Sequence, residues 1–234
     1  MATKIYTIEK LARQRLGELT PRFWSQDEML SYITAGIKDL WRAISDLKGE
    51  HFITISETVT LAANTATLTG VPTDVHKIIM ISPLDLSENS SNKGLHFRPA
   101  EYNSSAFQSS LGRADIDPSN DVIYYAITAQ GAPVGAPVIR VAPQVSSAVT
   151  LSFAYNPTVG TLTSSSNVPI PGECDNALVA WTIAYARSKE LESRAPDPSW
   201  LAIYAHEKSQ LLQSLGLRQT QEPAYVEAMF EEYW

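Results

Sequence analysis

Residues 25–48 carry the pattern that most constrains what this chain can fold into. Their apolar residues recur at steps of four, three, four and three, at Ile33, Ile37, Leu40, Ile44 and Leu47. This spacing places them on one face of an α-helix. Ser25 and Glu28 have the spacing of a capping box, which begins a helix, and Gly49 follows its end. The segment therefore predicts a long amphipathic helix that must bury one face against another element.

Three other segments have helical spacing. Residues 7–18 follow a possible Thr7 cap, and residues 171–192 carry a stripe of Leu178, Trp181 and Tyr185. The last helix begins at Asp197-Pro198, an N-cap followed by proline, and is expected to stop at Gly216. Because short helices need tertiary packing to persist, the simplest arrangement buries the N-terminal and C-terminal pairs against each other.

Between the helical segments the period changes to two. Alternating β-branched and aromatic runs predict strands at residues 52–56, 57–70, 75–82, 121–128, 137–143 and 148–157. Ala63-Asn64 is expected to form a hairpin turn, and Val149, Leu151, Phe153 and Tyr155 to share one face of the last strand. Residues 82–120 predict a long irregular loop with a short helix near 102–112.

The fold class is therefore α+β, with a helical bundle from the N- and C-terminal segments and an inserted antiparallel β domain. We expect residues 1–50 and 170–217 to form the bundle, residues 51–169 the inserted β domain, and residues 218–234 a C-terminal arm.

Composition excludes several classes of function. The formal net charge is −7, and the sequence contains no cluster of lysines and arginines, whereas tight binding of nucleic acid requires a basic surface. The single cysteine, Cys174, rules out an intrachain disulfide and fits a cytosolic origin. No apolar run is long enough to span a membrane, and the first residues lack a signal-peptide core.

A search for catalytic or metal-binding residues yields no candidate. Cys174 lies between Glu173 and Asp175, which would raise its thiol pKa and leave it inert. None of the four histidines has a second ligand at metal-binding spacing; they are His51, His76, His96 and His206. We therefore expect no enzyme activity, no catalytic residue, no cofactor and no metal.

Two further patterns have an ordinary structural explanation. Asp115, Asp117 and Asp121 favour an Asx-rich turn over a calcium loop. Tyr124 and Tyr125 are adjacent in a predicted strand, so they are expected to face opposite sides of a sheet and not to form a sugar-binding platform.

Two apolar surfaces predict contacts between subunits or with a partner. The helix at residues 25–48 has a second apolar flank with Met29, Tyr32 and Trp41, so we expect Trp41→Ala to impair assembly more than folding. The C-terminal sequence AMFEEYW has aromatic residues at helical steps, but the segment is too short to be a stable helix alone. It either folds back on its own domain or is covered by another subunit or protein.

The stretches EMLSYITAGIKDLWRAI (Glu28–Ile44) and IPGECDNALVAWTIAYARSKELE (Ile170–Glu192) resemble helices of head-to-tail connector proteins, or adaptors, of tailed bacteriophages. The order of parts is also similar: helix pair, β insertion, helix pair and C-terminal arm. Alternatives left open are a tail or tail-completion structural protein and a carbohydrate-binding or hydrolytic module with its site in the β domain.

The resemblance implies a structural virion protein at the head–tail interface. Such a protein forms a homo-oligomeric ring, commonly of twelve subunits, that docks under the portal, extends the DNA channel used in genome ejection and carries the tail proteins. DNA would pass through without specific binding. The resemblance also implies that the arm contacts the portal or an adjacent subunit, through Tyr225, Met229, Phe230, Tyr233 and Trp234.

Overall fold

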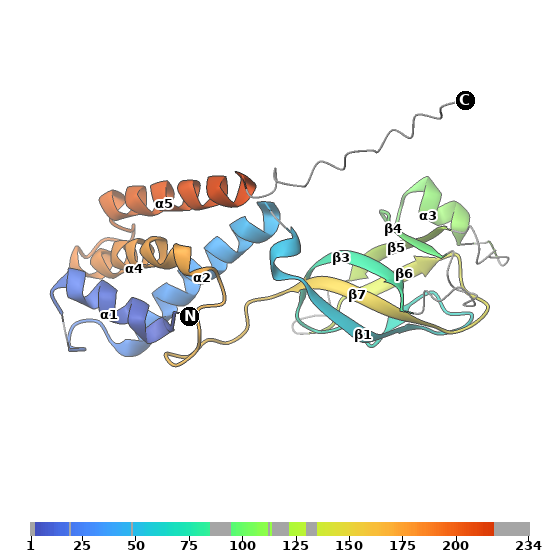
Figure 1. Ribbon diagram of the computed structural model, residues 1–234, viewed down its shortest axis with the longest axis horizontal. Coiled ribbons are helices and arrows are strands. Elements are labelled where there is room, and N and C mark those ends of the chain that lie inside the picture. Colours follow the sequence, from blue (N-terminus) through green and yellow to red (C-terminus); the bar gives the residue numbers. More distant parts are fainter. Residues whose placement is uncertain are drawn as a thin grey trace, which may run out of the picture. The chain divides into compact units, whose positions relative to one another are not determined.

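The computed structural model describes residues 3–18, 20–47, 49–84, 95–111, 113, 122–129 and 135–217. The chain divides into two compact units (Figure 1). One, the helical unit, consists of the residues up to 48 together with those from 161 onward; the other, the β unit, consists of residues 49–160. Helices at both ends of the chain and a central β region confirm the α+β class that the sequence predicts.

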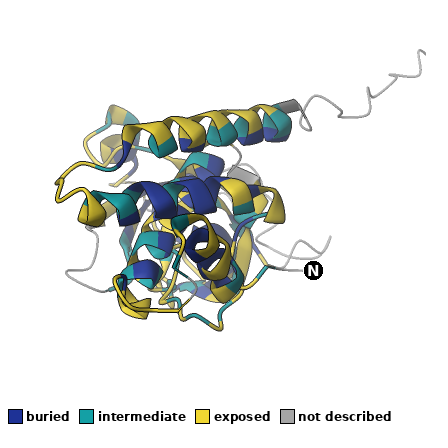
Figure 2. Ribbon diagram, turned by 90° about the vertical axis from the view of Figure 1, so that its left-hand side faces the viewer, coloured by how far each residue is buried: buried dark blue, intermediate teal, exposed yellow. Residues whose placement is uncertain are grey.

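Four helices form the helical unit. They are α1 (Ile5–Leu16), α2 (Gln26–Leu47), α4 (Asp175–Glu190) and α5 (Pro198–Leu217), and the short 3-10 turn η2 (Gly172–Cys174) precedes α4. Helix α4 packs against each of the other three helices. Buried positions on the helices face their neighbours and exposed positions face outward (Figure 2). None of the described helices is both long enough and apolar enough to cross a lipid bilayer.

The helix ends test the predicted caps. The backbone N–H of Ser25 donates to Glu28 Oε2 at 2.8 Å, and the backbone N–H of Glu28 donates to Ser25 Oγ at 3.2 Å, which confirms the capping box. Asp197 Oδ1 accepts from the backbone N–H of Ser199 at 2.9 Å, as expected of an N-cap.

Two predicted helix ends are wrong. Helix α1 begins at Ile5, ahead of the predicted Thr7 cap, and the left-handed Gly17 (φ 74°) closes it. Helix α5 continues through Gly216 to Leu217. Its last turns bury Leu211 and Leu215, so packing sustains the helix past the glycine.

The β unit contains two sheets. Strands β1 (Thr54–Leu61), β2 (Leu68–Thr69), β3 (Val75–Pro83) and β7 (Val149–Pro157) form an antiparallel sheet in the order β2-β1-β7-β3. Strands β4 (His96–Pro99), β5 (Val122–Ala129) and β6 (Val138–Ala142) form the other. The 3-10 turn η1 (Gly49–Phe52) leads into β1, and α3 (Ser105–Ser110) is the short helix expected near residues 102–112.

One strand corrects the sequence-based prediction. Strand β4 lies within the segment expected to be a loop, and it pairs in parallel with β5, so the β unit is not wholly antiparallel. Local pattern hardly signals this strand, because it spans only four residues, alternates weakly and ends at Pro99.

Both sheets contribute to one apolar core. The side chains of Val149, Leu151, Phe153 and Tyr155 are all buried in it, which confirms the predicted inner face of β7. Residues of β5 and β6 join them from the other sheet, including Ile123, Ile139 and Val141. The turn after β1 contains Asn64 with a left-handed φ of 55°, as its position in a hairpin requires.

The two adjacent tyrosines of β5 face opposite sides of their sheet, as predicted. Tyr125 lies in the common core, whereas Tyr124 packs on the other side with Phe107 of α3. The pair therefore cannot form a single aromatic platform for a sugar.

Candidate functional site

An open groove of about 760 Å³ lies on the helical unit between α2 and α5. Most of its lining is apolar: Leu47 comes from α2, Trp181 from α4, and Leu201, Ala205 and Leu212 from α5. The lining residues of α5 recur at steps of three and one, so a single face of that helix forms one wall over most of its length. An exposed apolar groove of this kind is typical of a binding surface.

A charged pair crosses the groove. Lys208 Nζ donates to Asp39 Oδ2 at 2.6 Å, and the Tyr204 hydroxyl donates to the same oxygen. Burial raises the pKa of Asp39, but the hydrogen bonds from Lys208 and Tyr204 outweigh this, so the net pKa lies below its usual value. Burial and the contact with the Asp39 carboxylate raise the pKa of Tyr204. At neutral pH the groove thus holds a carboxylate neutralised by an ammonium group.

Trp181 ties together the three helices that form the groove. Its Nε1 donates to the Tyr32 carbonyl oxygen of α2 at 3.0 Å, and its ring meets the ring of Tyr204 on α5 at a centroid distance of 4.8 Å. Gly36 makes the approach of α2 possible, because a Cβ at that position would lie 2.7 Å from Trp181 Cδ1. Trp181 therefore joins α2, α4 and α5 at the groove through its hydrogen bond to Tyr32 and its ring contact with Tyr204.

The predicted interface residues of α2 take different positions. Tyr32 is half-buried, and its ring stacks on Tyr185 of α4 at a centroid distance of 6.3 Å. Trp41 is only 5% exposed and Met29 is fully buried, so both are covered by their own chain. A contact of Tyr32 or Trp41 with another subunit stays a prediction. The predicted arm residues Tyr225, Met229, Phe230, Tyr233 and Trp234 lie outside the described residues.

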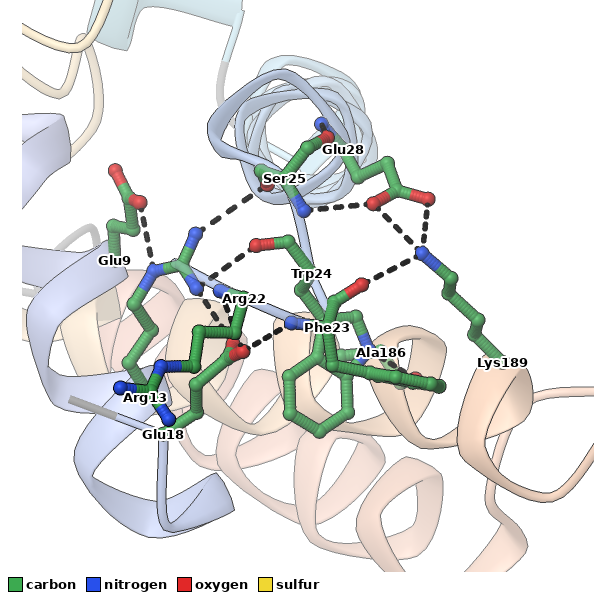
Figure 3. A network of polar contacts seen from close by, with 10 residues as sticks. All are labelled: Glu9, Arg13, Glu18, Arg22, Phe23, Trp24, Ser25, Glu28, Ala186 and Lys189. Atoms are coloured by element: carbon green, nitrogen blue, oxygen red, sulfur yellow. Dashed lines mark hydrogen bonds and ion pairs between the residues drawn. The ribbon is translucent and has the colours of Figure 1, made fainter. Parts of the chain in front are cut away.

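A polar network fixes the connection between α1 and α2 (Figure 3). At its centre the buried Arg13 donates to Glu9 Oε1 at 2.9 Å, to Glu18 Oε2 at 2.8 Å and to the carbonyl oxygen of Trp24 at 3.1 Å. Glu18 also accepts backbone N–H groups of the connection, from Arg22 at 2.8 Å and from Phe23. Partial burial raises the pKa of Glu18, and these backbone bonds lower it to a net value below the usual one.

The same connection is fastened to the end of α4. Trp24 Nε1 donates to the Ala186 carbonyl oxygen at 2.8 Å. Lys189 Nζ donates to the Phe23 carbonyl oxygen at 2.8 Å and forms an ion pair with Glu28 Oε1 at 2.8 Å. Hydrogen bonds from Lys189 and from the Ser25 backbone lower the pKa of Glu28 to about 2. Segments far apart in the sequence are thus locked together around the start of α2.

The remaining candidate residues show no catalytic arrangement. Burial, with Asp175 and Glu173 adding to it, raises the pKa of Cys174 to about 12, as the inert-thiol prediction requires. Within the part of the chain that the structure describes, no cluster of three or more His, Cys, Asp or Glu is placed to hold a metal ion. Asp115, Asp117 and Asp121 fall outside the described residues.

Sequence analysis missed two features. The groove depends on how α2, α4 and α5 cross, which no local pattern encodes. Arg13 had a visible signal, because it interrupts the apolar stripe of α1 and stands four residues after Glu9. A charged residue in such a stripe usually has a buried partner.

These features define an α+β protein of two compact units with an open apolar groove on its helical unit. The family model of the SU10 adaptor protein matches residues 4–227, nearly the whole chain, and the chain therefore belongs to this family. It is a structural adaptor protein of a bacteriophage and a virion component of the head–tail junction, where the family associates with portal and tail proteins. A search of curated proteins found no match to the chain.

Proposed function

We propose that this adaptor assembles as a ring, commonly of twelve subunits, that docks under the portal, extends the DNA channel and presents a platform for tail proteins. The observation that supports this most strongly is the family match over residues 4–227, which spans both units and the first ten residues, 218–227, of the expected C-terminal arm. The helical unit builds the ring, and the β unit faces the tail. The two tyrosines of β5 do not support the alternative of a carbohydrate-binding module, because Tyr124 and Tyr125 lie on opposite faces of their sheet.

Negative-stain imaging of the full chain mixed with portal tests the ring directly. We expect rings of the chain stacked on one end of the portal, with the chain alone remaining small if assembly requires the portal as a template. Portal particles that remain bare at saturating adaptor concentration would overturn the proposal.

We also propose that the channel does not grip DNA. A net charge of −7 repels phosphate groups, so the genome can slide past without being held. Electrophoretic mobility of duplex DNA should be unchanged by the isolated protein at physiological salt. Micromolar or tighter affinity there would contradict a channel that only guides DNA.

The C-terminal segment, residues 224–234, is proposed to contact the portal or an adjacent subunit and so to be required for attachment of the ring. Tyr225, Met229, Phe230, Tyr233 and Trp234 combine apolar contact area with neighbouring glutamates, and aromatic residues often anchor interfaces. Deleting residues 224–234 should abolish attachment to the portal while circular dichroism and thermal unfolding stay nearly unchanged. A melting temperature lowered by many degrees would show instead that the segment covers its own domain.

A further inference from the structure

We propose that the groove between α2 and α5 binds residues 224–234 of an adjacent copy of this chain. This inference deepens the proposed ring and rests on it, because it names the surface that receives the C-terminal segment. The groove would thus be occupied by a short helix, rich in aromatic side chains, that a second subunit supplies.

Length is the first argument. The α5 wall of the groove runs from Leu201 to Gln213, a helical rise of about 18 Å. Residues 224–234, whose sequence predicts a helix, would span about 16 Å. The chain continues past Leu217, the last described residue of α5, so each subunit supplies both a groove and a segment of the length that fits it.

The chemistry of the two surfaces also matches. On a helix, Tyr225, Val226, Met229, Phe230 and Tyr233 share one side, and Glu227 and Glu231 occupy the opposite side. The groove offers the apolar side chains of Leu47, Leu201 and Leu212, and the small Ala205 leaves room for a ring between them. Its carboxylate, Asp39, is already bound to Lys208, so it does not repel an acidic segment strongly. The arrangement is the helix-in-groove mode of peptide recognition.

The proposed ring names an adjacent subunit as the donor. A contact between a segment of one copy and a groove of the next is heterologous, and such contacts close into a ring when the rotation between subunits allows it. The six residues 218–223 are also long enough for the segment to return to its own groove, as in a helical hairpin. Occupancy by the chain's own segment is therefore the competing outcome that the experiments must exclude.

The first experiment measures binding to the groove. A fluorescent peptide of residues 222–234 is titrated with the full chain carrying Met229→Asp and Phe230→Asp, which disable its own segment. We expect micromolar affinity by fluorescence anisotropy. Ala205→Glu, an exposed change in the groove wall, should weaken it at least tenfold, because a long acidic side chain blocks the site and repels the peptide. Gln210→Glu places the same charge at an exposed position of α5 outside the groove lining and should change it less than twofold.

A second experiment identifies the donor. The Ala205→Glu chain keeps its segment but loses its groove, and the Met229→Asp, Phe230→Asp chain keeps its groove but loses its segment. Mixed at about 100 μM, well above the expected micromolar Kd, the two should form a one-to-one complex with twice the 25.7 kDa mass of one chain, visible by sedimentation. Neither variant should dimerise alone. A mixture that stays monomeric would overturn the proposal. The parent chain, which keeps both parts, distinguishes the two donors: if the segment acts in another copy, the parent groove is free and should bind the peptide within about twofold of the Met229→Asp, Phe230→Asp chain. Binding at least tenfold weaker would show that the segment occupies its own groove and that the proposal is wrong.

These outcomes separate this inference from the proposed function. The groove assignment would be overturned if the peptide fails to bind, or if it binds equally to the Ala205→Glu chain. If deletion of residues 224–234 still abolishes portal attachment in that case, the portal would be the receptor of the segment. Absence of rings on portal, with heterodimer formation intact, would instead overturn the ring and leave the groove contact standing.

Discussion

The helical unit and the β unit are held together by different means. In the helical unit, polar contacts and ion pairs join separate segments: Arg13 of α1 with the Trp24 carbonyl oxygen before α2, Lys189 of α4 with Glu28 of α2, and Lys208 of α5 with Asp39 of α2. In the β unit, the core cluster consists of apolar side chains and two tyrosines, and strand pairing sets the geometry.

The difference follows from how each unit is connected. The helical unit brings together chain segments separated by more than a hundred residues, and the crossing of helices is not fixed by backbone hydrogen bonds. Directional side-chain contacts therefore set the position of each helix. In a sheet the backbone ladder already fixes register, and a one-residue slip would move every core side chain to the outside. Because the backbone sets the register, the stability of the β unit depends mainly on the packing of its apolar core side chains.

Phe153→Ala should give the largest effect in the β unit. The side chain is fully buried in the core, and removing a buried phenylalanine ring costs about 3 to 5 kcal/mol of unfolding free energy. The four tryptophans that the structure describes, Trp24, Trp41, Trp181 and Trp200, lie in the helical unit, so their fluorescence reports on that unit, while hydrogen exchange of β7 amides reports on the β unit. We expect faster exchange in β7 and an unchanged fluorescence transition. A fluorescence transition shifted equally would show that the two units unfold as one.

Trp41→Ala makes the reciprocal test in the helical unit. Because Trp41 is 5% exposed, its removal should also cost about 3 to 5 kcal/mol, and alkylation of the buried Cys174 should accelerate as the unit opens. The β7 amides serve as the control and should keep their protection. Normal folding combined with lost assembly would contradict this and would favour a subunit contact at Trp41.

Arg13→Met tests whether the polar contacts of Arg13 stabilise the helical unit. Losing the guanidinium leaves two largely buried carboxylates without their cation, and breaking such a buried pair costs about 3 kcal/mol or more. Arg15→Met on the exposed side of the same helix should stay within about 0.5 kcal/mol of the parent. Denaturant unfolding of the two variants gives the comparison, and equal stability would mean that apolar packing alone positions α1.

Glu28→Gln should give the smallest effect, and one that depends on pH. The pKa of Glu28 is lowered from 4.5 to about 2, so its stabilising contribution is complete above about pH 5 and is lost as pH falls toward 2. The ion pair with Lys189 is well exposed to solvent, which limits the effect to about 1 kcal/mol or less. The free-energy difference between parent and variant should shrink between pH 6 and pH 3. A difference that is constant over this range would assign the effect to the helix cap alone.

Elements that depend on local pattern could be predicted from the amino-acid sequence. The steps of four and three in residues 25–48 and the Ser25–Glu28 capping box were enough to define α2, because helix periodicity and caps act within one or two turns. Alternation defined β7 and its buried face for the same reason. The resemblance in residues 28–44 and 170–192 also led to the adaptor family, which the match over residues 4–227 shows.

Features that join distant segments became visible only in the folded chain. Strand β4 exists because β5 offers it a parallel partner, and α5 continues through Gly216 because Leu211 and Leu215 are buried. Its own chain covers most of Trp41, and a contact of Trp41 with another subunit stays a prediction. The groove between α2 and α5 arises from the contact of Gly36 with Trp181, which are 145 positions apart in the sequence. Local pattern cannot encode such contacts, since they depend on the packing of whole elements against one another.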